Sequence, residues 1–205
     1  MPARFITLEG IEGSGKSTQL DFIVHFLQEK NVDAERTREP GGTELGEKIR
    51  ELLLSNDLTD MHEDTELTLM FAARIEHVNK VIKPALAAGK WVVCDRFYDA
   101  TYAYQGYGRE IDLNKIDVLR KYAIGELTPD LTLLLDIDLK TSGQRVVNRG
   151  NQDRFENEKV EFYQRVRNGY LALAKQHANR ITIIDSTQSV EQVQSDIVSK
   201  LKELL

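Results

Sequence analysis

The stretch that most constrains the fold lies near the start of the chain, at residues 10–17. It reads G-x-x-x-x-G-K-S, a pattern in which backbone N–H groups and the first turn of a helix form a cradle for phosphate. The apolar run at residues 5–8 predicts a buried strand before it, and the spacing of apolar residues in 19–28 predicts an amphipathic helix after it. A strand, a glycine-rich turn and a helix in this order indicate a nucleotide-phosphate site rather than a plain turn.

The residue types of this loop fit such a site. Lys16 supplies a mobile positive charge to the outer phosphates, and the Ser17 hydroxyl can ligate a bridging Mg²⁺. Glu12 fits less easily, because a carboxylate repels phosphate; we expect it to face a hydroxyl group or a metal-bound water of a second substrate. The close backbone approaches that the cradle needs are permitted by Gly10, Gly13 and Gly15.

Composition limits the class of protein. The chain has 205 residues, of which 41% are hydrophobic, enough for one domain with a full core. Its net charge of -6 argues against a general nucleic-acid binder, which needs a basic surface. No apolar run predicts a signal peptide or a membrane span, and Cys94 is the single cysteine. We therefore expect a cytoplasmic protein in which this thiol is buried in a strand.

Strand-like and helix-like segments alternate along the chain, which predicts a doubly wound α/β domain with a parallel five-stranded sheet, spanning residues 1–205 as one unit. The apolar runs that predict buried parallel strands lie at residues 5–8, 34–37, 91–94, 131–137 and 181–184. Helices are predicted at residues 16–30, 45–54, 65–88, 113–124, 140–148, 158–177 and 190–204.

Charged side chains follow two of these strands. In open α/β sheets ligands bind beyond the carboxyl ends of the strands, so Arg38 and Glu39 are candidates, although their segment also reads as a turn capped by Thr43. After the third strand, Asp95 can act on Mg²⁺ or its waters, and Arg96 can bind phosphate through two hydrogen bonds. The alternative is a simple ion pair between these two neighbours.

Two other regions can bind a flat heterocycle. Gln105 offers a hydrogen-bond donor and an acceptor that complement a base edge, and the neighbouring Tyr104 can wall the sugar. On the long third helix, Met70, Phe71 and Arg74 lie within one turn, where an aromatic or thioether group and a guanidinium can stack on a base and bind it. Both regions can equally be core packing, with Arg74 at the rim.

A polar tract at residues 149–153 separates two helical patterns and is the segment that we expect to move most. Arg145, Arg149 and Arg154 flank it. Phosphoryl transfer needs positive charge on the migrating group and exclusion of water, and arginines on a closing lid at about residues 145–157 would supply both. The alternative is a solvated helix end with ordinary ion pairs.

Two further patterns are interpreted as carrying no ligand. Residues 114–117 spell N-K-x-D, which should follow a buried strand in a guanine-binding protein, but a helical pattern continues through them here. The histidines have no metal-ligand spacing, and we expect solvated or capping roles for His25, His62, His77 and His177.

With these pieces in place, the chain resembles the bacterial type of the thymidylate kinase family over essentially its whole length. The resemblance lies in residues 10–17, 37–43, 71–74, 95–97 and 104–106 and in the arginines of the lid, in this order. It implies the fold of P-loop nucleoside monophosphate kinases, transfer of the γ-phosphoryl group of ATP to dTMP with Mg²⁺, and a homodimer.

The resemblance also implies a role for each matching position. ATP would be bound by Gly10, Ile11, Glu12, Gly13, Ser14, Gly15, Lys16, Ser17 and Thr18, with Arg145 against the adenine, and Mg²⁺ by Ser17 and Asp95. The acceptor dTMP would be contacted by Glu12, Arg38, Glu39, Pro40, Arg50, Met70, Phe71, Arg74, Arg96, Thr101, Tyr104 and Gln105. Because the phosphate loop carries no arginine, the catalytic groups would be Lys16, Arg96, Glu12 and the lid residues Arg149 and Arg154.

Within the acceptor site, Glu12 would meet the deoxyribose 3′-hydroxyl or a metal-bound water, and Tyr104 would crowd the place of a ribose 2′-hydroxyl. The family commonly places a stacking Phe four residues before the base-reading Arg74, where this chain has Met70, so whether Met70 or Phe71 stacks stays open. Two alternatives to this function are a kinase for another nucleoside monophosphate and a non-catalytic nucleotide switch.

Overall fold

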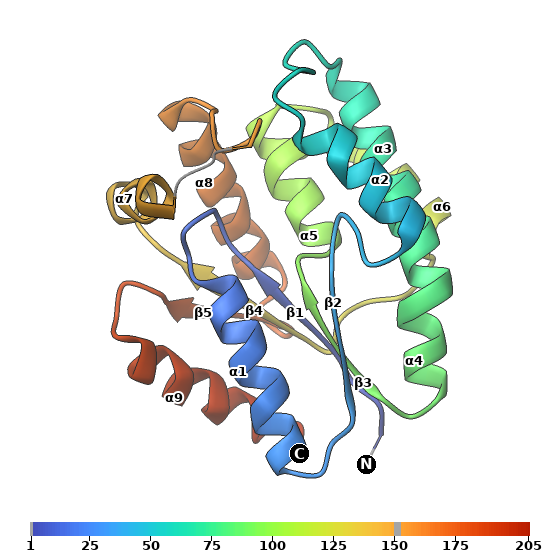
Figure 1. Cartoon of the computed structure of the whole chain (residues 1–205), viewed down its shortest axis with the longest axis vertical. Coiled ribbons are helices and arrows are strands. Elements are labelled where there is room, and N and C mark those ends of the chain that lie inside the picture. The colour runs from blue at the N-terminus through green and yellow to red at the C-terminus, as the bar shows by residue number, and fades with distance from the viewer. Residues whose placement is uncertain (1, 150–152) are drawn as a thin grey trace.

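The computed structural model describes residues 2–149 and 153–205, and of Arg149 only the backbone. Its centre is a sheet of five parallel strands in the order β2-β3-β1-β4-β5 (Figure 1). The strands are β1 (Phe5–Glu9), β2 (Ala34–Arg38), β3 (Trp91–Asp95), β4 (Leu131–Asp136) and β5 (Ile181–Asp185). Each predicted strand is therefore present, to within one residue at either end.

Helices connect the strands, and η marks those that are π-helices. They are α1 (Lys16–Glu29), α2 (Glu44–Leu54), α3 (Glu63–His77), η1 (Val78–Ile82), α4 (Lys83–Ala87), α5 (Tyr98–Thr101), η2 (Tyr102–Gly108), α6 (Leu113–Ile124), α7 (Leu139–Arg149), α8 (Val160–Gln176) and α9 (Val190–Leu201). In Figure 1 the starts of α1 and α2 lie at the end of the sheet where the strands finish, which is where α/β folds bind ligands. Among the described residues no helix has the length and apolarity to cross a bilayer.

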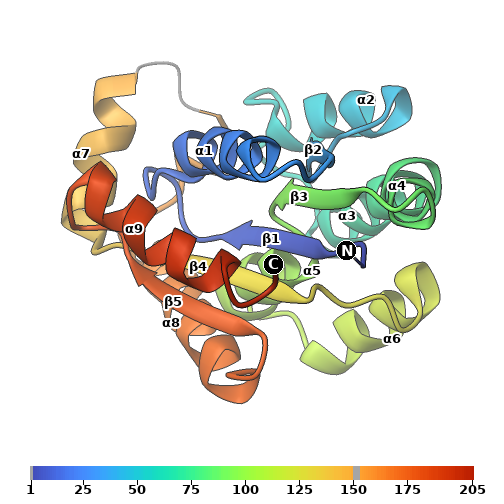
Figure 2. The same ribbon diagram turned by 90° about the horizontal axis from the view of Figure 1, so that it is seen from below.

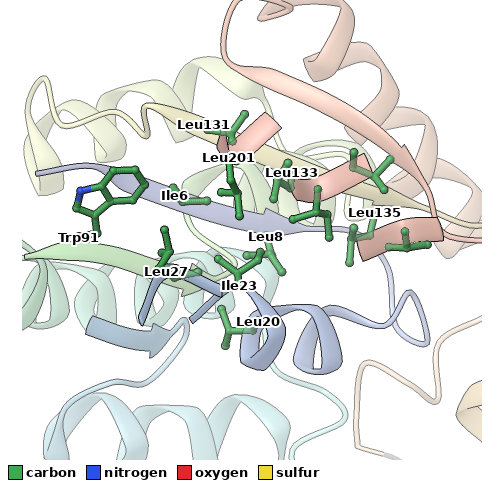
Figure 3. Packing of buried hydrophobic residues seen from close by; sticks show 14 of the residues in the cluster. Ile6, Leu8, Leu20, Ile23, Leu27, Trp91, Leu131, Leu133, Leu135 and Leu201 are labelled. Carbon is green, nitrogen blue, oxygen red and sulfur yellow. The ribbon is translucent and has the colours of Figure 1, made fainter. Parts of the chain in front are cut away.

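Different helices cover the two faces of the sheet (Figure 2). On one face, β1 and β4 pack against α1 and α9 in a buried cluster that includes Ile6, Leu8, Leu20, Ile23, Leu27, Leu133 and Ile197 (Figure 3). On the other face, Phe5 and Val92 pack with residues of α3 and α6, and Leu134 packs with residues of α8. Cys94 of β3 belongs to this second face and is fully buried, as predicted. Burial on both faces is the reason that the strands read as apolar runs.

The long helix predicted at residues 65–88 changes its hydrogen-bonding pattern along its length. The π-helix η1 separates α3 from α4, and Pro84 stands in the first turn of α4. Proline has no N–H group, and its ring clashes with the carbonyl four residues earlier. The wider π-helical turn before Pro84 accommodates both effects. The chain therefore stays helical from α3 to α4, although its α-helical hydrogen bonds are interrupted at η1.

No helix is predicted from the sequence at residues 98–108, where α5 runs directly into η2. Two glycines lower the helical propensity of this region, but the packing requires them. A Cβ on Gly106 would lie 2.5 Å from a methyl group of Leu113, and a Cβ on Gly108 would lie 2.6 Å from the ring of Phe162. Close packing against α6 and α8 therefore outweighs local propensity in the region that carries several predicted site residues.

A buried carboxylate joins three elements at the carboxyl end of the sheet. Glu9 closes β1 and is hydrogen-bonded to the backbone N–H of Phe97 at 2.7 Å and to the hydroxyl of Tyr170 at 2.8 Å. Burial, followed by the negative charge of Asp99, raises the pKa of Glu9 to about 8. Arg96, just before Phe97, has a φ of 66°, a left-handed conformation that costs a non-glycine residue about 1 kcal/mol. The hydrogen bond that Phe97 donates to Glu9 helps to hold this turn.

The raised pKa of Glu9 predicts that stability falls as the pH rises. Between about pH 5.5 and the folded pKa of about 8, the folded chain keeps a proton that an unfolded carboxyl group, with a pKa near 4.5, has lost. The free energy of unfolding then falls by up to about 1.4 kcal/mol per pH unit from this group. Glu9→Gln should flatten the dependence in urea unfolding, whereas the exposed control Glu51→Gln should not. Equal slopes in all three proteins would contradict a protonated Glu9.

Candidate active site

The phosphate loop joins β1 to α1 and is packed closely against neighbouring backbone. A Cβ on Gly10 would lie 2.6 Å from the carbonyl oxygen of Leu135, and one on Gly13 would lie 2.7 Å from that of Ser142. Both glycines also have a positive φ, 140° and 71°. The hydroxyl of Ser142 donates to the carbonyl oxygen of Glu12 at 2.8 Å, which ties the loop to α7. Only glycine satisfies these approaches, so the motif is a steric requirement of the loop.

Lys16 folds back over the loop that precedes it. Its Nζ donates to the carbonyl oxygens of Gly10 and Ile11, each at 2.9 Å. Burial, followed by the positive charge of Arg96, lowers the pKa of Lys16 to about 8. An anion in the loop would counter both effects and restore the full charge of the ammonium group.

Arg145 of α7 lies beside the loop. Its guanidinium donates to the carbonyl oxygens of Gly13 and Ser186, each at 3.2 Å. The hydroxyl of Ser186, just after β5, donates to the carbonyl oxygen of Ser14 at 2.5 Å. The loop, α7 and the turn after β5 thus form one wall, on which a flat guanidinium is available for stacking.

The carboxylate of Glu12 connects the loop to the end of β3. Its Oε1 accepts a hydrogen bond from Arg96 at 2.6 Å, and its Oε2 accepts one from the hydroxyl of Tyr104 at 2.6 Å. Burial would raise the pKa of Glu12, but the charges of Arg96 and Lys16 outweigh burial and lower the pKa below its ordinary value. Glu12 is therefore ionised, and Arg96 balances the negative charge that looked out of place in a phosphate loop.

A second buried carboxylate, Glu39, follows β2. Its oxygens contact Nε of Arg74 at 2.6 Å and Nδ1 of His77 at 2.9 Å, and Nε2 of His77 lies 2.6 Å from the hydroxyl of Thr37. The expectation that His77 is solvated or a cap is wrong, because these partners satisfy both ring nitrogens in the interior. Arg74 also donates to the carbonyl oxygen of Phe97 at 3.2 Å, while its buried Nη1 has no hydrogen-bond partner within the described chain.

Three arginines bring positive charge to the same end of the sheet. Burial, followed by the charges of Arg38 and Arg96, lowers the pKa of Arg50. Arg50 donates to the carbonyl oxygen of Pro40 at 3.0 Å, and the exposed Arg38 pairs with Glu47 at 2.7 Å. Guanidinium groups gathered at one end of the sheet form a site where a phosphate group is stabilised.

One pocket contains most of the predicted acceptor residues. It is lined by Glu12, Glu39, Pro40, Arg50, Leu54, Met70, Arg74, Arg96, Phe97, Ala100, Thr101, Tyr104, Gln105, Asp153 and Phe155. Arg38 does not line it, and Phe71 lies in the core with its ring centre 4.9 Å from the guanidinium carbon of Arg74. Met70 rather than Phe71 therefore contributes to the pocket wall.

Some lining residues are absent from the sequence-based set: Leu54, Phe97, Ala100, Asp153 and Phe155. Phe97 and Ala100 follow β3 closely, so the rule for strand ends is a signal that could have found them. Leu54 and Phe155 carry no local signal, because they meet only in the folded chain, where the backbone N–H of Arg154 donates to the carbonyl oxygen of Leu54 at 3.2 Å.

Of the two predicted catalytic arginines of the lid, Arg154 is the one whose side chain is among the described residues. Arg154 is buried: its Nη2 lies 2.8 Å from Oε2 of Glu66, and its Nε donates to the carbonyl oxygen of Leu53 at 2.9 Å. It does not line the pocket in this conformation. The side chain of Arg149 and residues 150–152, part of the predicted lid, lie outside the described residues.

Asp95 and Ser17 fit a site for Mg²⁺. The Oδ1 atom of Asp95 is buried and has no hydrogen-bond partner in the described part of the chain, and Ser17 is exposed in the first turn of α1 with Thr18 beside it. Within residues 2–149 and 153–205 no group of three or more His, Cys, Asp or Glu residues could hold a metal. Such a sparse set of oxygen ligands suits Mg²⁺, which keeps several waters and binds substrate phosphates.

The N-K-x-D string lies on α6, which confirms the predicted helix through these residues. Asp112 caps this helix by accepting from the backbone N–H of Asn114 at 2.9 Å. Lys115 pairs with Asp64 at 3.3 Å, and Asp117 accepts a hydrogen bond from the hydroxyl of Tyr102. These contacts are those of a surface helix rather than of a base-binding loop.

Comparison with known proteins places this geometry in a family. A family model described as thymidylate kinase matches residues 8–197. The chain is 52% identical over 194 residues to the thymidylate kinase of Ruthia magnifica subsp. Calyptogena magnifica, covering 95% of each chain, and 50% identical over 197 residues to that of Nitrosospira multiformis, covering 96% of each. The crystal structure of thymidylate kinase from Ehrlichia chaffeensis matches with a TM-score of 0.80 at 37% identity, covering 98% of this chain and 99% of that one. This chain therefore belongs to the thymidylate kinase family.

Proposed function

We propose that this chain transfers the γ-phosphoryl group of ATP to dTMP, giving ADP and dTDP. The observation that supports this most strongly is the ion pair between Glu12 and Arg96, 2.6 Å long, which joins the phosphate loop to a separate pocket. A protein that only binds a nucleotide needs the loop alone, whereas a transferase needs a second site next to it. The thymidylate kinases that resemble this chain supply the identity of the acceptor.

On the donor side, we assign the phosphates of ATP to residues 10–18 and its adenine to the face of Arg145. When bound, Mg²⁺ would neutralise charge on the transferring phosphate. Asp95 and Ser17 would hold the ion, since one offers an unpartnered buried oxygen and the other an exposed hydroxyl. Lys16 would exchange its two carbonyl contacts for phosphate oxygens.

On the acceptor side, the two ends of the pocket suit the two ends of dTMP. Arg50 and Arg96, with Arg38 nearby, would bind the phosphate. At the other end, the free Nη1 of Arg74 offers a donor to a carbonyl oxygen of the base. The Nε2 of Gln105 already donates to a carboxylate at 2.8 Å, which leaves the amide oxygen to accept from the ring N–H of thymine.

Other lining residues would complete the acceptor site. Thr101 would assist in base recognition, and Met70 would pack on the base together with the turn at Glu39 and Pro40. Glu12 would meet the 3′-hydroxyl of the sugar. The ring of Tyr104, fixed by its hydrogen bond to Glu12, would occupy the space that a ribose 2′-hydroxyl needs.

The reaction needs no protein nucleophile, because a phosphate oxygen of dTMP attacks the γ-phosphorus directly. Lys16 and Arg96 would spread the developing negative charge. Of the two lid arginines, Arg149 is the better candidate for a third positive charge. Arg154 would first have to leave its ion pair with Glu66.

Consumption of ATP with dTMP, dUMP, dCMP, dGMP and UMP tests the proposal. We expect dTMP to have the highest kcat/KM, and dUMP, which lacks one methyl group, to be about 10–200-fold poorer. For dCMP, whose ring has no N–H at the position that Gln105 would read, we expect a loss of about 10⁴-fold. Efficient turnover of a different monophosphate without turnover of dTMP would instead identify the alternative kinase, and hydrolysis of ATP without any acceptor would support a nucleotide switch.

We also propose that the protein is a homodimer in the cytoplasm. The proposal is supported by α6, which lies against α3 and carries Val118 and Tyr122 on one face, 68% and 83% exposed. Apolar side chains this exposed suit a surface covered by a second copy. Sedimentation at micromolar concentration should give twice the chain mass of 23.4 kDa, and a species of 23.4 kDa would contradict the dimer.

A further inference from the structure

Glu66 is a buried carboxylate that the proposed mechanism does not use. It lies on α3 and is 1% exposed. Its Oε1 accepts hydrogen bonds from Nε2 of Gln105 at 2.8 Å and from Nε of Arg109 at 3.3 Å. Its Oε2 accepts from Nη2 of Arg109 at 3.3 Å and lies 2.8 Å from Nη2 of Arg154. One carboxylate thus gathers three side chains from two other segments of the chain.

Charge balance makes the carboxylate important to this group. Arg154 is 6% exposed, and Arg109 is 18% exposed and pairs also with Glu158 at 2.5 Å. Two guanidinium groups are therefore compensated by two carboxylates, in a region where Glu66 and Arg154 are buried and Arg109 and Glu158 are partly exposed. Removing one charge from such a group leaves a buried cation poorly compensated, and its segment then gains by moving toward water.

One side chain that Glu66 holds lines the acceptor pocket, and another lies between two residues that line it. Gln105 lines the pocket, and so do Asp153 and Phe155 on either side of Arg154. The ring centre of Phe155 is 4.6 Å from the guanidinium carbon of Arg154 and 5.9 Å from the ring centre of Tyr104. The position of this wall therefore follows the position of Arg154.

We propose that Glu66 is a positioning residue for the acceptor pocket. It orients the amide of Gln105 so that the oxygen is left for the base, and it holds the segment around Arg154 against α3 so that Phe155 closes the wall. The inference rests on the proposed function for the identity of the acceptor. It assigns Arg154 a role in shaping this pocket while it is paired with Glu66, in addition to the catalytic role predicted from the sequence.

Glu66→Gln tests the proposal with a side chain of the same shape and no charge. We expect the KM for dTMP to rise about tenfold, with kcat and the KM for ATP within about twofold of wild type, because only acceptor binding depends on this wall. The preference for dTMP over dCMP should also fall. The control is Glu63→Gln, an exposed residue of the same helix, which should leave every value unchanged. An unchanged KM for dTMP and unchanged preference in Glu66→Gln would overturn the proposal.

Hydrogen exchange gives a readout that is independent of turnover. In Glu66→Gln, amides of residues 105–109 and 153–158 should exchange faster than in wild type and in Glu63→Gln, while amides of β1 and β4 keep their rates. Faster exchange throughout the sheet would indicate a general loss of stability and would overturn a specific positioning role.

Arg154→Gln tests the same contact from its other side and leaves Arg109 to balance Glu66. We expect a higher KM for dTMP, and a double variant with Glu66→Gln whose effect on this KM is smaller than the sum of the two single effects. A KM for dTMP that stays at the wild-type value in Arg154→Gln would overturn the proposal.

Wild-type turnover separates the two hypotheses. If the wild-type protein does not phosphorylate dTMP, the proposed function fails, and the exchange rates of the two segments alone decide the role of Glu66. If wild type is active but neither variant changes the acceptor KM, only the positioning role fails.

Discussion

The ion pair between Glu12 and Arg96 is the contact on which the site depends, because it joins residues 84 positions apart in the chain. The phosphate loop follows β1, Arg96 follows β3, and these strands are neighbours in the sheet. Arg96 makes this pair from a left-handed backbone with a φ of 66°, and the hydrogen bond that Phe97 donates to Glu9 helps to hold that turn. The donor and acceptor sites are thereby held next to each other by the framework of the sheet.

Other buried carboxylates around the pocket also hold polar side chains in place. Glu39 holds Arg74, Glu66 holds Gln105 and Arg154, and in each case a buried carboxylate fixes a polar group that the proposed reaction or its pocket needs. Burying a charge is costly unless it is paired, so each carboxylate requires a partner and thereby sets that partner's orientation. This explains how a chain with a net charge of -6 can present a cluster of arginines to anionic substrates.

Features that depend on local sterics could be predicted from the sequence, and features that depend on distant partners could not. The strands are buried on both faces and therefore read as apolar runs, and Gly10 has no room for a Cβ. The expectation that His77 is solvated or a cap is wrong because its partners in the interior, Glu39 and Thr37, are 38 and 40 residues away in the chain. Close packing to α6 and α8 makes residues 98–108 helical against their glycine content, and Phe155 reaches the pocket only through tertiary contacts.

The most direct test of the central claim is a crystal structure of the chain with dTMP and a non-hydrolysable analogue of ATP. We predict that the dTMP phosphate contacts Arg96 beside its pair with Glu12, that Nη1 of Arg74 and the amide oxygen of Gln105 bind the base, and that the ATP analogue occupies the phosphate loop. If dTMP lay outside the pocket, or bound with its base toward Arg96 and its phosphate toward Arg74, this would contradict the claim that the pair of Glu12 and Arg96 holds the acceptor phosphate next to the donor site.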